Sequence, residues 1–236
     1  IALALAAFFI YRETETSAYQ AHHLAKLAND LRWEVKNGPN GGLHLPQAGP
    51  YDMRLGYSRL PELLKNLTER GFHVHAQARI SPRMKELVER GLFVPYREKA
   101  QAGLEIVDGN GQPLYRAVFP TRIYENFESI PPLVTNSLLF IENRELLDPA
   151  QPKKNPAIEW TRLGKAVLDK AIQFVRPEHD VPGGSTLATQ IEKYRHSPHG
   201  MTLSPNDKMQ QIASASVRAY LNGEDTMPTR KRIVVD

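Results

Sequence analysis

The eleven residues from Gly183 to Lys193, GGSTLATQIEK, have types and spacing that suit the binding of an anion. Two glycines allow a tight turn, after which Ser185 or Thr186 can cap a helix by accepting a free backbone N–H. On that helix Thr186, Gln190 and Lys193 share one face, at positions i, i+4 and i+7. Because free N–H groups and a lysine both attract negative charge, the pattern favours a phosphate site. An ordinary capped helix with a solvated polar face is the alternative.

Glu142 is a candidate general base. It stands in FIENR (140–144), at the end of an amphipathic helix predicted to follow Ile130-Pro131-Pro132. A carboxylate there meets the negative end of the helix dipole and little water, which suits a proton acceptor. A plain surface residue at a helix end is the alternative.

Composition limits the classes of function. The 236 residues allow one large or two small domains, and 41% hydrophobic residues can build a core. A net charge of +4 suits pyrophosphate or anionic lipid. No run of Lys and Arg is interleaved with aromatic residues, which disfavours nucleic acid as a partner. The absence of cysteine excludes disulfide and thiolate-metal scaffolds.

The first eleven residues are apolar and uncharged, ending at Tyr11. They are too few to span a bilayer, which takes about 20, but they match the exit half of a longer span. A buried helix or a signal-peptide remnant is the alternative. We therefore expect a membrane-anchor remnant with a helical stalk over residues 1–36, followed by a Gly- and Pro-rich linker over 37–50.

Residues 51–103 predict a small α/β unit of unknown role. Helical spacing over 60–70 ends at Gly71, residues 72–80 alternate as in a half-buried strand, and a short helix begins after Ser81-Pro82. His73 and His75 point the same way on such a strand. Without a third ligand nearby, the polar outer face of a strand is the better interpretation than a metal site.

A hairpin is predicted within residues 104–124, with strands at 104–107 and 114–119 and a turn at Asp108-Gly109-Asn110-Gly111. The order of hairpin, Ile-Pro-Pro helix and glutamate is similar to that of the family 51 glycosyltransferases, the peptidoglycan transglycosylases. Their Gly-x-Ser-Thr-Ile-Thr-Gln-Gln-x-x-Lys motif resembles residues 183–193. Ser185, Thr186, Gln190 and Lys193 match this motif, whereas Ala188 and Thr189 depart from it.

The other family motifs are matched only in part. Of Glu-Asp-x-x-Phe-x-x-His-x-Gly, the chain keeps only Glu142, and the positions that differ are Asn143, Leu146, Pro149 and Gln151. In the Arg-Lys-x-x-Glu position, Lys208 matches, Asp207 replaces Arg and Gln211 replaces the acid. Arg230 stands where the Lys-x-x-Ile-Leu motif has its lysine.

The resemblance implies an α+β chain whose residues 104–236 form part of a mostly helical, lysozyme-like transglycosylase domain. It further implies a peptidoglycan glycosyltransferase that polymerises lipid II with inversion and releases polyprenyl pyrophosphate. Glu142 would be the base, and the substrate-binding residues would be Ser185, Thr186, Gln190, Lys193, Lys208, Gln211 and Arg230. The implied partners are lipid II, the nascent glycan chain, membrane lipid and envelope proteins. The resemblance also implies that the protein lies at the external face of a bacterial inner membrane, held by a single-pass anchor.

The resemblance implies no required cofactor, although a divalent cation would be compatible with the family. Gln211 cannot ionise, so a weakened or inactive relative that binds lipid II as a scaffold is the main alternative. Glu145, Glu159 or Glu192 could substitute for the second acid, although their positions do not match the motif. A lysozyme-like hydrolase is a more distant possibility.

Overall fold

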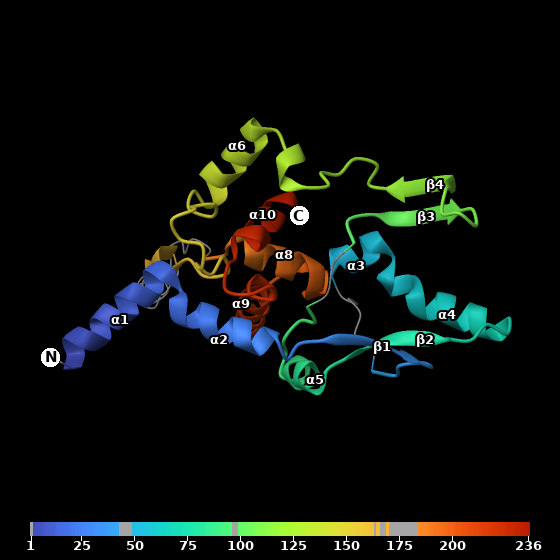
Figure 1. Ribbon diagram of the computed structural model, residues 1–236, viewed down its shortest axis with the longest axis horizontal. Coiled ribbons are helices and arrows are strands. Elements are labelled where there is room, and N and C mark those ends of the chain that lie inside the picture. Colours follow the sequence, from blue (N-terminus) through green and yellow to red (C-terminus); the bar gives the residue numbers. More distant parts are fainter. Residues whose placement is uncertain (1, 43–48, 96–98, 163, 166–168, 170–183) are drawn as a thin grey trace.

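The computed structural model describes residues 2–42, 49–95, 99–162, 164–165, 169 and 184–236, and the chain is α+β. Within these residues, helices surround a central helical core, and two separate two-stranded sheets lie toward one end of the molecule (Figure 1). The predicted fold class is thus confirmed at the level of α+β.

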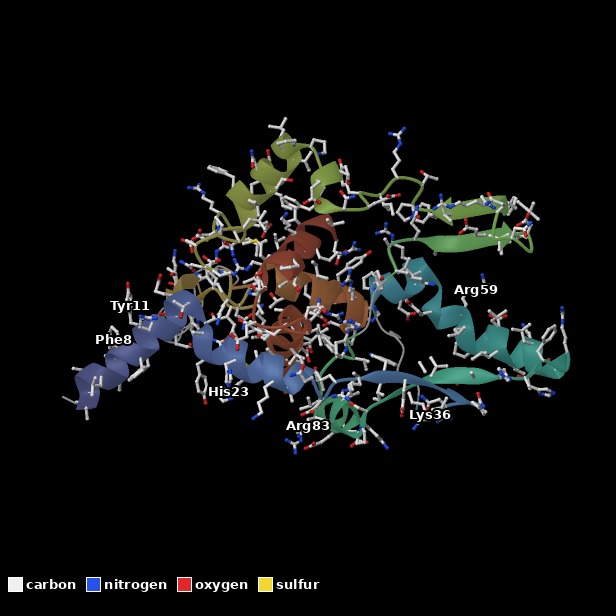
Figure 2. All side chains as sticks on the ribbon, viewed as in Figure 1. Phe8, Tyr11, His23, Lys36, Arg59 and Arg83 are labelled. Carbon is white, nitrogen blue, oxygen red and sulfur yellow. The ribbon has the colours of Figure 1, made fainter. Side chains whose placement is uncertain are left out.

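The N-terminal segment forms two helices, α1 (Ala2–Thr16) and α2 (Ala18–Ala28). They are separated at Ser17, which has a left-handed φ of 51°. The Glu13 carboxylate accepts the backbone N–H groups of Tyr19 and Gln20, so it satisfies the free donors at the start of α2. Phe8 and other apolar side chains of α1 project into solvent (Figure 2).

The helical stalk that the sequence predicts up to residue 36 ends at Ala28. Trp33–Asn37 form strand β1, which pairs antiparallel with β2 (Ala76–Ile80), with Val35 opposite Ala78. Aromatic and β-branched residues favour a strand there, and the pairing satisfies the backbone groups. In the described part of the chain, no helix has both the length and the apolar content needed to cross a membrane. The membrane anchor therefore stays a prediction.

The predicted helices of the small unit are confirmed. They are α4 (Leu60–Glu69) and α5 (Pro82–Glu89), the latter capped by the Ser81 hydroxyl, which accepts the N–H of Met84. A short helix, α3 (Pro50–Leu55), and a 3-10 turn, η1 (Tyr57–Arg59), precede them. The predicted strand over 72–80 begins only at Ala76, and His73 and His75 are exposed before it.

The predicted hairpin is also confirmed, as β3 (Ala102–Val107) and β4 (Pro113–Phe119). At its turn the Asp108 carboxylate accepts the backbone N–H groups of Asn110 and Gln112. A 3-10 turn, η2 (Phe127–Ser129), leads into the predicted helix α6 (Pro132–Glu142).

The core is built on three C-terminal helices, α8 (Leu187–His196), α9 (Pro205–Ala219) and α10 (Met227–Val235), with η3 (Pro198–Gly200) after α8. Small residues allow α8 and α9 to approach closely, with Ala188 packed near Ala215. On another side of α9, Val217 packs with Leu31 and Met84. α9 therefore ties both α2 and the small unit to the core (Figure 1).

Candidate active site

The start of α8 is a capped helix terminus, as the sequence predicts. The Thr186 hydroxyl accepts the N–H of Thr189, and the Thr189 hydroxyl accepts the N–H of Thr186, a reciprocal capping box. Thr186 is only 2% exposed, so its hydroxyl serves the helix. Ser185, one residue earlier, is half-buried. Gly183 lies outside the described residues.

Glu142 and Gln190 meet across two helices. Glu142 is the last residue of α6, and the Gln190 amide on α8 donates to its carboxylate, with 3.1 Å between Nε2 and Oε2. Both side chains are half-buried. The hydrogen bond therefore brings the candidate base to α8 while leaving it accessible to a ligand.

Lys208 lies on α9, and its side chain reaches the start of α8. Its Nζ donates to the Ser185 hydroxyl at 2.6 Å. Burial lowers the pKa of Lys208, and the positive charge of Lys193 lowers this pKa further. The two ammonium groups therefore lie close enough to repel each other, and an anion between them would relieve that repulsion.

The lysines and the carboxylate share one side of α8. Gln190 and Lys193 are three residues apart, so their side chains are neighbours on the helix surface. Gln190 holds Glu142, and Lys193 acts electrostatically on Lys208, which is bound to Ser185. A proton acceptor and two cations are thus connected through the same helix, a set of groups suited to removing a proton while an anionic group departs.

Gln211 lies apart from this cluster. It is 1% exposed, and its amide donates to the hydroxyls of Ser197 and Thr202, at 3.0 Å in each case. The expected role in substrate binding therefore has no support in its contacts, because the side chain is occupied in joining the end of α8 to the loop before α9.

Arg230 is likewise placed in the interior, and its contacts give no support to its expected role as a site cation. It is 1% exposed, and its guanidinium donates to the hydroxyl of Thr226 and to backbone carbonyls in the loop after α6. The accepting carbonyls belong to Leu146, Asp148, Gln151 and Lys154. A guanidinium surrounded by carbonyl oxygens satisfies buried backbone acceptors, so Arg230 anchors this loop.

The three acids considered as substitutes for the missing second carboxylate have other partners. Glu192 is buried, 2.5 Å from Arg218, Glu145 pairs with Lys154 at the surface, and Glu159 pairs with Arg162, three residues later. Among the described residues, no group of three or more His, Asp or Glu side chains is arranged to hold a metal ion. The described residues therefore contain no set of side chains that matches the ligands of the divalent cation considered above.

A feature that the sequence interpretation missed is Asp207, in the position of the motif's arginine. Its carboxylate accepts the backbone N–H groups of Leu203 and Ser204, which lower its pKa, and it completes a capping box at the start of α9. The spacing Ser204-x-x-Asp207 is itself a capping signal and could have revealed this role.

A cavity of about 860 Å³ lies on a different face of α8 from the candidate site. It is lined by Ile191, Arg195 and Arg218 among others, and by none of the eight predicted site residues. The size of a cavity is therefore a poor guide to the chemistry here, and the convergence of Glu142, Gln190 and the lysines is the better one.

Comparison with known proteins agrees with this geometry. A family model described as Transglycosylase matches residues 110–227, half of the chain, and this range includes Glu142, Ser185, Lys193 and Lys208. No curated protein and no solved structure matches the chain. The chain therefore belongs to the transglycosylase family, the family 51 glycosyltransferases, as a divergent member.

Proposed function

We propose that the chain is a peptidoglycan glycosyltransferase that polymerises lipid II into glycan strands. The observation that carries the proposal is the hydrogen bond from Gln190 to Glu142, because it joins two family motifs that lie 48 residues apart in the sequence. The matched transglycosylase region supports the same reaction class.

Glu142 acts as the general base. Its carboxylate takes the proton from the attacking sugar hydroxyl of one lipid II as the oxygen forms a bond to the anomeric carbon of the lipid-linked glycan. The bond from that carbon to the pyrophosphate oxygen breaks, the anomeric configuration inverts, and polyprenyl pyrophosphate leaves with the bonding electrons. Gln190 orients the carboxylate oxygen that accepts the proton.

Lys193 and Lys208 stabilise the leaving group. Negative charge grows on the pyrophosphate as the glycosidic bond breaks, and two positioned ammonium groups are attracted to it increasingly. The lowered pKa of Lys208 reflects a poorly solvated cation beside a second cation. A bound pyrophosphate would supply the negative charge that this pair lacks, with Ser185 fixing the direction of Lys208.

Exposed apolar side chains near the base support a lipid-linked substrate. Phe140 and Ile141 precede Glu142 on α6 and are 65% and 72% exposed. α1 exposes a second apolar set that includes Phe8 and Tyr11 (Figure 2). Such surfaces suit the boundary of a bilayer, and we propose the external face of a bacterial inner membrane as the place of action, with envelope proteins as partners.

A non-catalytic role in binding lipid II is the second candidate, and Gln211 is the observation that favours it. The family ordinarily has an acid at this position, whereas Gln211 is neutral and buried. Such a relative would keep the pyrophosphate site and act as a scaffold without turnover.

Glycan-chain formation from labelled lipid II tests the proposal. We expect wild type to form chains and Glu142→Gln to lower kcat by about 10²- to 10⁴-fold, the usual contribution of general base catalysis. Glu145→Gln is the matched control, because Glu145 is exposed and pairs with Lys154 at the surface, and it should leave the rate unchanged.

Two results would change the conclusion. Equal rates for wild type and Glu142→Gln would remove the base assignment. The scaffold role would be established instead if the wild type formed no glycan chains but bound lipid II, and if Lys193→Ala weakened that binding.

A further inference from the structure

α3 packs against α8, although α3 lies outside the matched transglycosylase region. Figure 1 shows α3 beside the helix that carries Lys193. A segment from the small unit is therefore in direct contact with the helix of the candidate active site.

Gly49, the residue that caps α3, touches the backbone of the last turn of α8. A Cβ at this position would lie 2.7 Å from the carbonyl oxygen of Tyr194 and 2.8 Å from that of Arg195, closer than side chains tolerate. The φ of Gly49 is −95°, which any residue can adopt. Glycine is needed here because of the close approach of two backbones, and not because of an unusual conformation.

Tyr51 strengthens this contact. Its side chain is buried, the Arg195 guanidinium carbon lies 5.3 Å from its ring centroid, and the Tyr194 ring centroid lies 6.5 Å away. Its hydroxyl donates to the backbone carbonyl of Lys99. Together with Gly49, Tyr51 therefore contacts both of the residues that directly follow Lys193.

We propose that residues 49–55 are a positioning clamp for Lys193. By holding Tyr194 and Arg195, the clamp fixes the turn of α8 that carries Lys193 and so fixes the direction in which its ammonium meets the pyrophosphate of the lipid-linked donor. The identity of this anion rests on the proposed function. Gly49 and Tyr51 do not contact the substrate, and they act through Lys193.

The clamp has a consequence that can be observed without turnover. Lys193 helps to keep the pKa of Lys208 low. If the last turn of α8 moves, Lys193 moves away from Lys208, the repulsion falls and the pKa of Lys208 rises toward its ordinary value. A defect that only lowered the stability of the small unit would leave this pKa unchanged.

Gly49→Val in the full chain tests the clamp, with Gly109→Val as the matched control, since a Cβ at Gly109 would meet open space. We expect Gly49→Val to weaken the binding of inorganic pyrophosphate about tenfold by calorimetry, as misplacement of a charged group would. We also expect it to raise the pKa of Lys208, followed by NMR of the lysine side-chain carbons. In polymerisation it should lower kcat at least as much as it raises KM for lipid II, because Lys193 meets a charge that grows in the transition state. Gly109→Val should match wild type throughout.

Tyr51 provides a second pair of variants in case Gly49→Val does not fold. Tyr51→Phe keeps the ring against Arg195 and should retain most of the pyrophosphate affinity, whereas Tyr51→Leu should lose as much as Gly49→Val. Unchanged pyrophosphate affinity and an unchanged Lys208 titration in the folded variants would overturn the clamp. If wild type binds no pyrophosphate, the proposed function fails, and the Lys208 titration by itself then decides whether the clamp positions Lys193.

Discussion

The two sides of the candidate site are built in different ways. On the cation side, α8 and α9 each begin with a reciprocal capping box and pack closely through small residues. Lys208 projects from this packed pair and is held by Ser185. The cations are therefore positioned by the core before any substrate arrives.

The base side is far more exposed. α6 begins without a side-chain cap, and Thr135 is the one residue of this helix that is buried. Phe140 and Ile141 face solvent directly before Glu142, and Gln190 is the partner that fixes the carboxylate. This fold therefore builds its anion site into the core, whereas a local hydrogen bond and an anchored loop bring the base to that site.

The largest expected effect comes from replacing Arg230. This residue lies on α10 and binds carbonyls of the loop after α6, so it ties the base side of the site to the core. Arg230→Met leaves several buried carbonyls without donors, so the free energy of unfolding should fall by about 3–5 kcal/mol. Denaturant titration measures this change. Arg230→Lys should not restore stability, because one ammonium cannot reproduce the planar set of donors.

Lys231→Met is the control for Arg230. Lys231 pairs with Glu128 at the surface, and such pairs contribute less than about 1 kcal/mol. If Arg230→Met proved as mild as Lys231→Met, the loop would be held by other contacts, and a direct role for Arg230 with substrate would return.

A smaller effect is expected from Gln211→Glu, which restores the acid of the family motif on the packed side. A carboxylate cannot donate to Ser197 and Thr202 as the Gln211 amide does, so stability should fall by about 1–3 kcal/mol without a gain in polymerisation rate. Gln112→Glu, at an exposed turn, should cost little.

The pH dependence of Gln211→Glu has a definite sign. Burial raises the pKa of the new carboxyl above its unfolded value, so the native state holds its proton where the unfolded state has lost it. The destabilisation should therefore grow as the pH rises from about 4 toward the raised pKa, which unfolding titrations at several pH values measure. A rate increase in this variant would instead show that residue 211 reaches the reacting groups.

Local patterns were sufficient to predict much of the fold. The helix ended by Gly71, the helix capped by Ser81 and the hairpin around Asp108 each depend on residues close together in sequence. Strand β1 was missed because its five residues gain their order from pairing with β2, about forty residues later. Periodicity within a segment cannot indicate a partner that distant.

The site was predictable in part, and for a different reason. The cap at Thr186 followed from spacing, whereas the meeting of Glu142 with the helix that carries Lys193 was expected only from the resemblance to the family. Arg230 matched a motif by residue type, yet its partners are carbonyls of a distant loop. Whether a basic side chain faces a ligand or the protein interior is decided by tertiary packing, which a short motif does not contain.

The smallest expected effect concerns Gln190, the hydrogen bond by which the base side is joined to the core. Gln190→Met keeps the length of the side chain and removes the donor, so Glu142 loses its orientation while the core packing stays. We expect kcat/KM for lipid II to fall about tenfold, because this factor corresponds to about 1.4 kcal/mol, the net free energy of one hydrogen bond. The unfolding midpoint should stay nearly unchanged. Steady-state polymerisation assays measure it, with Gln112→Met as the exposed control. A loss in Gln190→Met as large as that in Glu142→Gln would mean that the single contact is essential to the base, and no loss would mean that substrate alone orients Glu142.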